Sequence, residues 1–120
     1  MKSKWITYEG KKIFYCDYSN FQADIQALQV ENEAVDAIFC QQPMNSVLSL
    51  SDLQNTVGSA EVVELFKKSA SRTKPYARKQ AVIGVSGIKR ILAEAVARVS
   101  GQRMTYFENA ESAKDWLVAE

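Results

Sequence analysis

The chain has no histidine, and its two cysteines lack the paired spacing of a metal-binding or redox motif. Histidine is the side chain that most often acts as an acid or base near neutral pH, and zinc sites and cysteine nucleophiles usually recruit it as well. We therefore expect Cys16 and Cys40 to be small buried apolar residues. The sequence predicts no catalytic residue, no metal site and no cofactor, and an enzyme is the least favoured function class.

Long hydrophobic runs, low-complexity tracts and internal repeats are absent as well. No apolar stretch approaches the roughly 20 residues of a membrane-spanning helix, and residues 1–5 are not followed by the apolar core of a secretory signal. The 120 residues, 47% hydrophobic and 24% charged, are enough for one core. We predict a single domain over residues 1–120, located in the cytoplasm.

Residues 81–88, Ala-Val-Ile-Gly-Val-Ser-Gly-Ile, are the most informative stretch. The nearly unbroken apolar run predicts a strand covered on both faces, in the sheet interior and extending from Arg78 to Val85. A glycine turn then leads into a helix, and strand-turn-helix is the unit of an α/β sheet. We expect Ile88, Ile91 and Leu92 to hold this helix against the sheet, with positions 89 and 90 pointing away.

Turn and capping signals divide the rest of the chain. Strands over 4–8 and 11–17 flank Glu9-Gly10, a pattern typical of an antiparallel hairpin. A helix capped by Ser19 or Asn20 follows and ends before Pro43. The remaining elements are a strand over 47–51, a helix capped by Ser59, the strand and helix described above, a strand over 104–107 and a helix capped by Asn109. The predicted fold is α/β, with order ββαβαβαβα and a mixed sheet in which parallel strands follow the hairpin.

Several of these segments resemble a STAS domain, the fold of bacterial anti-sigma-factor antagonists, whose core is similar to that of SEC14-type lipid-binding domains. The resemblance lies in the hairpin and in three segments. They are Ser-Val-Leu-Ser-Leu-Ser-Asp over 46–52, Ala-Glu-Val-Val-Glu-Leu-Phe over 60–66 and Val-Ile-Gly-Val-Ser-Gly-Ile-Lys-Arg over 82–90. It implies a signalling module that binds a protein partner, in some members a kinase-type anti-sigma factor.

In the STAS family the partner kinase phosphorylates a serine or threonine at the start of the second helix. Thr56 and Ser59 lie at the matching place and are the candidate phosphorylation sites that the resemblance implies. The Asp-Ser-(Ser/Ala)-Gly sequence of switchable members is replaced here by Asn-Thr-Val-Gly-Ser over 55–59. For Ser59, simple helix capping is the competing interpretation.

Asp52 stands just beyond the third strand, where ligands bind in open α/β sheets. Its carboxylate could bind a partner or hydroxyl group, or it could only accept hydrogen bonds from its own turn. Asp17 ends the second strand, so the two carboxylates could lie close together if those strands are neighbours. Strand-end aspartates that solvate a loop are far commoner than catalytic pairs.

A second candidate site is the turn formed by Gly84, Ser86 and Gly87, whose backbone could approach an anionic ligand at the start of the next helix. Lys89 and Arg90 in the first helical turn oppose the helix dipole, which favours an anion nearby. The competing interpretation is a tight turn with no ligand.

Charge and aromatic residues are unevenly distributed. Residues 61–103 hold ten Lys or Arg against three Glu, so the basic side could attract an anionic partner, or it could consist of solvated helix faces. The aromatic residues gather in the first part of the chain, where they could pack in the core or line an apolar cavity. They are Trp5, Tyr8, Phe14, Tyr15, Tyr18 and Phe21. Their separation from the basic residues argues against single-stranded nucleic acid as a partner.

Two functions remain after these observations. The first is a non-catalytic STAS-like module that binds a protein partner through the loop before Ser59 and the helix that follows. The second is a carrier of a small apolar or phosphate-bearing ligand, held between sheet and helices near residues 84–87.

Overall fold

Five strands form one sheet in the order β1-β2-β3-β4-β5. The computed structural model describes residues 1–119, in which β1 (Lys4–Tyr8) and β2 (Lys11–Asp17) form the antiparallel hairpin. The strands β3 (Val47–Asp52), β4 (Ala77–Ile83) and β5 (Thr105–Tyr106) continue the sheet in parallel. The predicted order, the mixed sheet and the interior position of β4 are confirmed.

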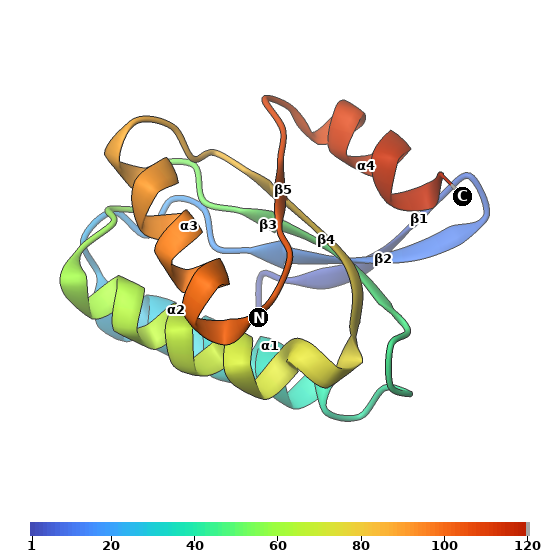
Figure 1. Cartoon of the computed structure of the whole chain (residues 1–120), viewed down its shortest axis with the longest axis horizontal. Coiled ribbons are helices and arrows are strands. Elements are labelled where there is room, and N and C mark those ends of the chain that lie inside the picture. The colour runs from blue at the N-terminus through green and yellow to red at the C-terminus, as the bar shows by residue number, and fades with distance from the viewer. Residues whose placement is uncertain (120) are drawn as a thin grey trace.

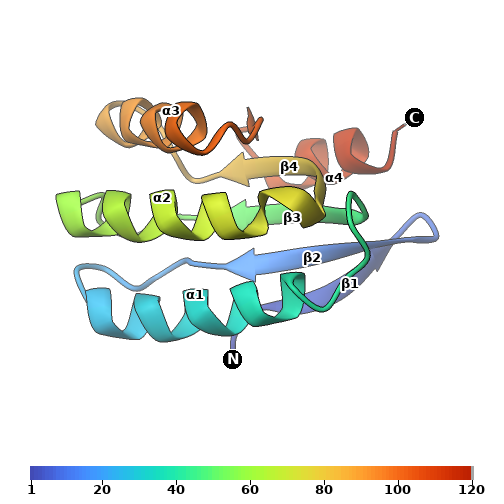
Figure 2. The same ribbon diagram turned by 60° about the horizontal axis from the view of Figure 1, so that its bottom comes forward.

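Four helices cover the two faces of this sheet unequally. The helices α1 (Ile25–Phe39), α2 (Ala60–Thr73) and α3 (Ile88–Ser100) lie side by side in one layer, and α4 (Ala110–Val118) lies on the opposite face (Figures 1 and 2). A 3₁₀ turn over Lys74–Tyr76 joins α2 to β4. Along the described part of the chain, no helix combines the length and the apolar character that a membrane span requires.

The predicted caps of α2 and α4 are confirmed. Ser59 Oγ accepts a hydrogen bond from Val62 N at 3.2 Å, and Asn109 Oδ1 accepts one from Ser112 N at 2.8 Å. Such bonds satisfy N–H groups that have no partner within the helix. The predicted end of α3 is confirmed too, because Gly101 takes a left-handed conformation with φ of 75°.

The start of α1 differs from the prediction, since its N-cap is Asp24 rather than Ser19 or Asn20. Asn20 and Gln22 have positive φ values of 61° and 55°, which no helix accepts. The central strand also ends at Ile83 rather than Val85, because Gly84 turns the chain with φ of 82°. The spacing of apolar residues predicted that α1 and β4 exist. The first residue of α1 and the last residue of β4 depend on loop contacts, which this spacing does not indicate.

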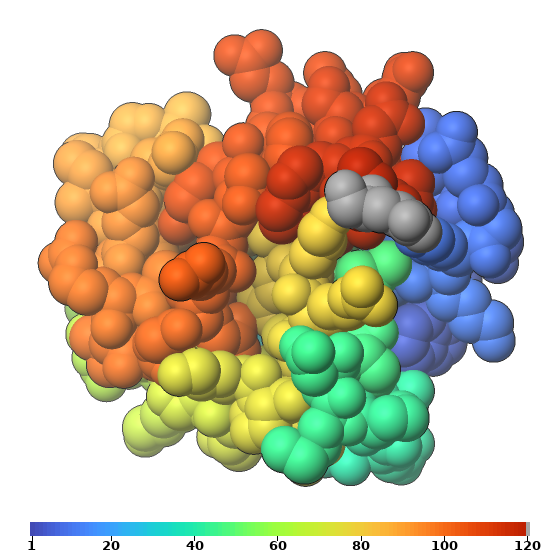
Figure 3. Space-filling model, turned by 45° about the vertical axis from the view of Figure 1, so that its right-hand side comes forward, coloured from blue at the N-terminus to red at the C-terminus, as the bar shows by residue number. Residues whose placement is uncertain are grey.

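Each face of the sheet has its own core. Towards the layer of α1, α2 and α3 lie Phe14, Cys16, Tyr18, Leu28, Val35, Phe39, Val47 and Val62. Towards α4 lie Ile13, Leu50, Ala81, Ile83, Ala113 and Leu117. The helix α4, red in Figure 3, lies against the blue hairpin, where Tyr8 Oη donates to Asp115 Oδ1 at 2.5 Å. The chain therefore forms a three-layer arrangement around two buried clusters.

Two expectations about burial are wrong. Cys40 is exposed at the C-terminal end of α1, although Cys16 is buried as expected. On α3, Ile88 is 75% exposed and Ile91 is 65% exposed, because the helix turns Leu92 and Val96 inward instead. The sequence of α3 defines a stripe of apolar residues along the helix. This stripe is wider than the face of α3 that α2 and the sheet cover, so part of it stays exposed.

Of the early aromatic residues, Phe14 and Tyr18 are buried in the core, whereas Tyr8, Tyr15 and Phe21 are partly buried against it and Trp5 is 39% exposed. The ring centroids of Trp5 and Phe14 lie 4.9 Å apart, and those of Tyr18 and Phe66 lie 5.0 Å apart, both in edge-to-face geometry. Such pairs contribute beyond the burial of their area. The aromatic residues of the hairpin and of the segment after it therefore contribute to packing, as one of the two interpretations of the sequence expected.

Candidate functional site

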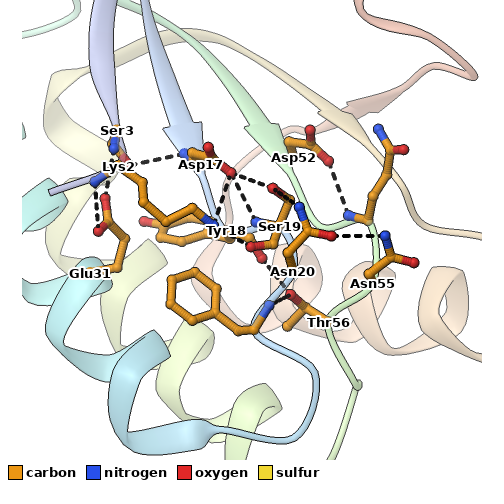
Figure 4. Close-up of polar contacts among 12 residues, drawn as sticks. Lys2, Ser3, Asp17, Tyr18, Ser19, Asn20, Glu31, Asp52, Asn55 and Thr56 are labelled. Carbon is orange, nitrogen blue, oxygen red and sulfur yellow. Dashed lines mark hydrogen bonds and ion pairs between the residues drawn. The ribbon is translucent and has the colours of Figure 1, made fainter.

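The loops that follow β2 and β3 are joined into one unit at the carboxyl edge of the sheet (Figure 4). Asn20 N donates to Gln54 O at 2.8 Å, Gln22 N to Asn55 O at 2.9 Å, and Val57 N to Gln22 O at 2.8 Å. These backbone bonds satisfy groups that a free loop would leave to water. The loop before α2 is thus held in place by the segment that precedes α1.

Thr56 is the centre of this junction. Its side chain is buried, its hydroxyl donates to Tyr18 O at 2.6 Å, and the same oxygen accepts a hydrogen bond from Phe21 N at 3.2 Å. Both hydrogen-bonding roles of the hydroxyl are therefore in use. In this conformation Thr56 is not accessible to an external kinase, whereas Ser59 is partly exposed at the start of α2.

The two strand-end aspartates are neighbours in the sheet, since Asp17 and Asp52 are register partners of β2 and β3. Each one, however, has separate partners. Asp52 is buried and accepts hydrogen bonds from Tyr15 Oη at 2.7 Å and from Gln54 N at 3.0 Å. Asp17 accepts the Ser19 hydroxyl and lies 3.5 Å from Lys2 Nζ. Both carboxylates therefore stabilise the edge of the sheet.

The environment of Asp52 changes the titration of Tyr15. Burial, together with the hydrogen bond to the Asp52 carboxylate, raises the pKa of Tyr15 well above its usual value. The phenol therefore stays neutral and keeps donating to Asp52 across the physiological range. This pair fixes the end of β3 and does not provide a group that exchanges protons near neutral pH.

Gly84 is required for the close approach of two protein segments. A Cβ atom at this position would lie 2.4 Å from Gln54 N, and the φ of 82° is also unfavourable for other residues. The turn over 84–87 then borders an open surface hollow that Gln54, Arg90 and Tyr106 also line. Ser86 and Gly87 are exposed there.

The two basic residues of the first turn of α3 have protein partners. Lys89 Nζ donates to Leu53 O at 2.6 Å, which corrects the expectation that position 89 points away from the core. Burial lowers the pKa of Lys89, and Asp52 opposes that shift. Arg90 Nε donates to Glu94 at 3.1 Å, and its guanidinium lies 3.9 Å from the centre of the Tyr106 ring.

Other members of the basic segment also serve internal contacts. Arg72 binds Asp36 through Nη2 at 2.6 Å, and Lys79 Nζ donates to the carbonyls of Trp116 and Ala119 at the end of α4. These cations stabilise an acidic side chain and a helix C-terminus. Arg72, Lys79, Lys89 and Arg90 of the basic segment therefore have partners within the protein.

Three large apolar side chains stay exposed near the start of α3. Val57, in the loop before α2, is 49% exposed, and the other two are Ile88 and Ile91. A pocket of about 50 Å³ lies between α2 and α3, with Val57, Val85, Lys89 and Leu92 in its wall. We call Val57, Ile88 and Ile91 the α3 apolar patch.

A second cavity, of about 100 Å³, lies between the sheet and the helix layer. It is not at residues 84–87, where the sequence placed a ligand. Its floor includes Ser49 and Ser51 from β3 and Gln80 from β4, and Phe66, Ala70, Ala93 and Val96 face them from α2 and α3. Sequence reasoning missed this cavity, although polar residues on interior parallel strands are an unusual signal that pointed to it.

Groups of three or more potential metal-ligating side chains do not occur within residues 1–119. Neither the family models nor the curated proteins include a match to this chain. The structure establishes an α/β fold with a mixed five-stranded sheet. The function of the chain has to be inferred from its residues.

Proposed function

We propose that this chain is a non-catalytic STAS-like module that binds a protein partner with the α3 apolar patch and the adjoining loop before Ser59. The support is the exposure of Ile88 and Ile91, which lie three positions apart on α3, together with exposed Val57, which lines a pocket with Lys89 and Leu92 of the same helix. Apolar side chains that gather on a surface are typical of interaction sites. The loop beneath them is fixed by hydrogen bonds to residues 20–22, so a partner would bind a preformed surface.

The kind of partner that fits is a protein that presents an apolar side chain to the pocket between α2 and α3. A strongly anionic partner is not required, because Lys89 and Arg90 already have partners within the chain. An apolar contact of this kind depends little on salt. The same surface would be the docking place of a kinase-type partner, as the STAS resemblance implies.

Ser59 adjoins this surface and provides the position for control. A phosphate on Ser59 would lie at the N-terminus of α2, near free backbone N–H groups, and would add about −1.5 to −2 charges. The modification would thus change the charge beside the α3 apolar patch without unfolding the junction around Thr56. Replacement Ser59→Asp tests the charge, and Ser59→Ala tests capping alone.

The decisive experiment compares affinity baits in an extract of the source cells. Wild type, the double variant Ile88→Asp/Ile91→Asp and the control Val30→Asp are compared by quantitative mass spectrometry. Val30 is a matched control because it is 69% exposed and lies on α1, in another helix. We expect one protein to be enriched by wild type and by Val30→Asp and lost with the double variant. Enrichment that is equal on all three baits would contradict the proposal.

A further inference from the structure

The centre of the sheet is polar on the side that faces α2 and α3. Ser49 of β3 is the register partner of Gln80 of β4, and Ser51 in the next row is the partner of Cys16 of β2. Interior parallel strands usually present branched apolar side chains to the helices that cover them. Here the covered strands instead present hydroxyl, carboxamide and thiol groups. This departure from the usual pattern needs a physical explanation.

Two of these polar side chains have no hydrogen-bond partner within the described part of the protein, and their polar atoms are open to the cavity rather than sealed. Ser49 is 1% exposed and Gln80 is 8% exposed. No group within residues 1–119 forms a hydrogen bond with either side chain. Polar groups in a protein interior generally have a hydrogen-bond partner, either in the protein or in a molecule that occupies the adjoining space. Both side chains line the cavity of about 100 Å³, which can supply the missing partner.

Much of the opposite wall of the cavity is apolar. Phe66 and Ala70 of α2 and Ala93 and Val96 of α3 face the floor, and the small alanines leave the space open. The pocket beside Val57 shares Phe66, Ala93 and Val96 with this cavity, so the two spaces adjoin. Ser69, Thr73 and Gln102 also line the cavity, but they have hydrogen-bond partners within the protein. A guest would therefore meet unpartnered hydrogen-bonding groups on the floor and apolar groups opposite it.

The charges around the cavity select a neutral guest. No lysine or arginine of the described chain lines it, and its one carboxylate, Asp36, is already bound by Ser69 and Arg72. Burial also raises the pKa of the Cys16 thiol to about 12, so this thiol is neutral. An anionic group in this cavity would be buried without a cation, so the cavity favours a neutral guest.

We propose that this cavity binds a small neutral molecule that has an apolar body and one hydrogen-bonding head, such as an alcohol, a phenol or an amide. The head bonds to Ser49 and Gln80, and the body lies against Phe66, Ala93 and Val96. An engineered cavity of about 150 Å³ in another protein holds benzene, so a space of this size suits a guest of about that size or smaller. Water alone fits the polar floor but gains nothing from the apolar wall.

The test uses phenol and benzene as a matched pair of probes, followed by two-dimensional NMR of ¹⁵N-labelled protein. We expect phenol to cause saturable shifts of the Gln80 side-chain amide and of the backbone amides of Ser49 and Ser51. In the variant Ser49→Ala/Gln80→Leu, phenol should bind about tenfold more weakly, because the hydrogen bonds of its hydroxyl group are lost. Benzene affinity should stay equal or rise in the same variant.

Two α3 variants locate the site. Ala93→Leu fills the cavity and should abolish the binding of both probes, whereas Ala95→Leu, two residues further along the helix and outside the cavity wall, should leave it intact. Thermal melts of both variants verify that they are folded. The double variant Ile88→Asp/Ile91→Asp should bind phenol like wild type, which separates this site from the surface proposed for a protein partner.

Three results would overturn the proposal. The first is the absence of saturable phenol shifts in the wild type, together with slowly exchanging water contacts at Ser49 and Gln80, since the cavity would then hold water only. The second is phenol binding that survives Ala93→Leu, because the site would lie elsewhere. The third is an equal loss of affinity for phenol and for benzene in Ser49→Ala/Gln80→Leu. Ser49 and Gln80 would then not recognise the hydroxyl group of phenol.

Discussion

The two faces of the sheet are built from the same strands but from different kinds of residue. Towards α4, Ile13, Leu50, Ala81 and Ile83 form an apolar cluster that Leu117 completes. Towards the helix layer, the same strands present Cys16, Ser49, Ser51 and Gln80 beside a cavity. The strand residues that face α4 therefore stabilise the fold by apolar packing. The strand residues that face the cavity contribute less packing and instead present hydrogen-bonding groups.

The helix layer compensates for this polar floor at its edges. Asn32, fully buried in α1, donates to Tyr18 Oη and to Ser69 Oγ, both at 3.0 Å, and Ser69 donates to Asp36 at 2.7 Å. This network joins α1, Tyr18 just after β2, and α2 around the cavity. The face thus contains two classes of polar residue, those with partners within the protein and those that point into the cavity.

The largest expected effect concerns the two cysteines, which lie inside and outside this layer. At pH 8 a thiol with a pKa of about 12 is ionised on the order of 10⁻⁴, and Cys16 is also shielded by the helices. We expect iodoacetamide to label exposed Cys40 more than about a thousandfold faster than Cys16. Mass spectrometry after timed quenching measures both rates. Comparable rates would show that the helix layer opens readily.

The apolar face is tested by Leu50→Ala, because Leu50 is fully buried against α4. Loss of this side chain should lower the free energy of unfolding by about 2–5 kcal/mol, which is the usual cost of a large-to-small core change. Urea denaturation measures it. Exposed Met44→Ala is the control, with an expected change within about 0.5 kcal/mol. A small effect for Leu50→Ala would contradict the close packing of Leu50 against α4.

The partnered polar residues are tested by Asp36→Ala. The variant leaves Ser69 and Arg72 without their acceptor, and we expect a loss of about 1–3 kcal/mol in urea melts. Desolvation raises the pKa of Asp36, although the bonds from Ser69 and Arg72 oppose this. The additional change Arg72→Met should therefore cost little in the Asp36→Ala background. A full additive loss would argue that the two side chains act separately.

A smaller effect is expected where the N-terminus meets the helix layer. Glu31 of α1 accepts hydrogen bonds from Lys2 N at 3.0 Å and Ser3 N at 2.8 Å. Desolvation alone would raise the pKa of Glu31, but these bonds outweigh it and lower the value below 4.5. The unfolded chain therefore binds the proton more readily, and the stabilisation is present above the unfolded pKa and lost as pH falls.

We accordingly expect Glu31→Gln to cost about 1 kcal/mol at pH 7, because one charged acceptor is replaced by a neutral one. The gap between variant and wild type should narrow below pH 4.5 as Glu31 becomes protonated. Thermal melts from pH 3 to 7 measure this convergence. Glu33→Gln on the same helix, whose carboxylate accepts a hydrogen bond from the Gln29 side chain, is the control. A gap that is independent of pH would contradict the assigned role.

The smallest effect is expected for Ser49→Ala. This hydroxyl has no partner within residues 1–119, so its removal should change stability by only about 0.5 kcal/mol, in either direction. Urea denaturation of Ser49→Ala and of Leu50→Ala gives the change in the free energy of unfolding for each. The two residues are adjacent in β3 and face opposite helix layers. A loss above about 1 kcal/mol would show that Ser49 has a structural hydrogen bond and would weaken the contrast between the faces.

The sequence by itself determined the order of elements, the hairpin at Glu9-Gly10, the caps Ser59 and Asn109 and the interior position of β4. These features are local: turn glycines, capping side chains and unbroken apolar runs act within a few residues, so they can be recognised from the chain alone. Asp52, Thr56 and Gly84 were correctly placed at one edge of the sheet for the same reason.

The tertiary structure alone decided how those residues are used. Thr56 and Gly84 join two loops rather than face solvent, and Lys89 turns inward to Leu53. Ile88 and Ile91 stay exposed, and Ser49 meets Gln80 beneath two helices. Each of these outcomes depends on which segments lie against one another across 30 or more residues. Such distant contacts leave no periodic trace in a single sequence, because a helical stripe or a strand alternation specifies a face but not its neighbour.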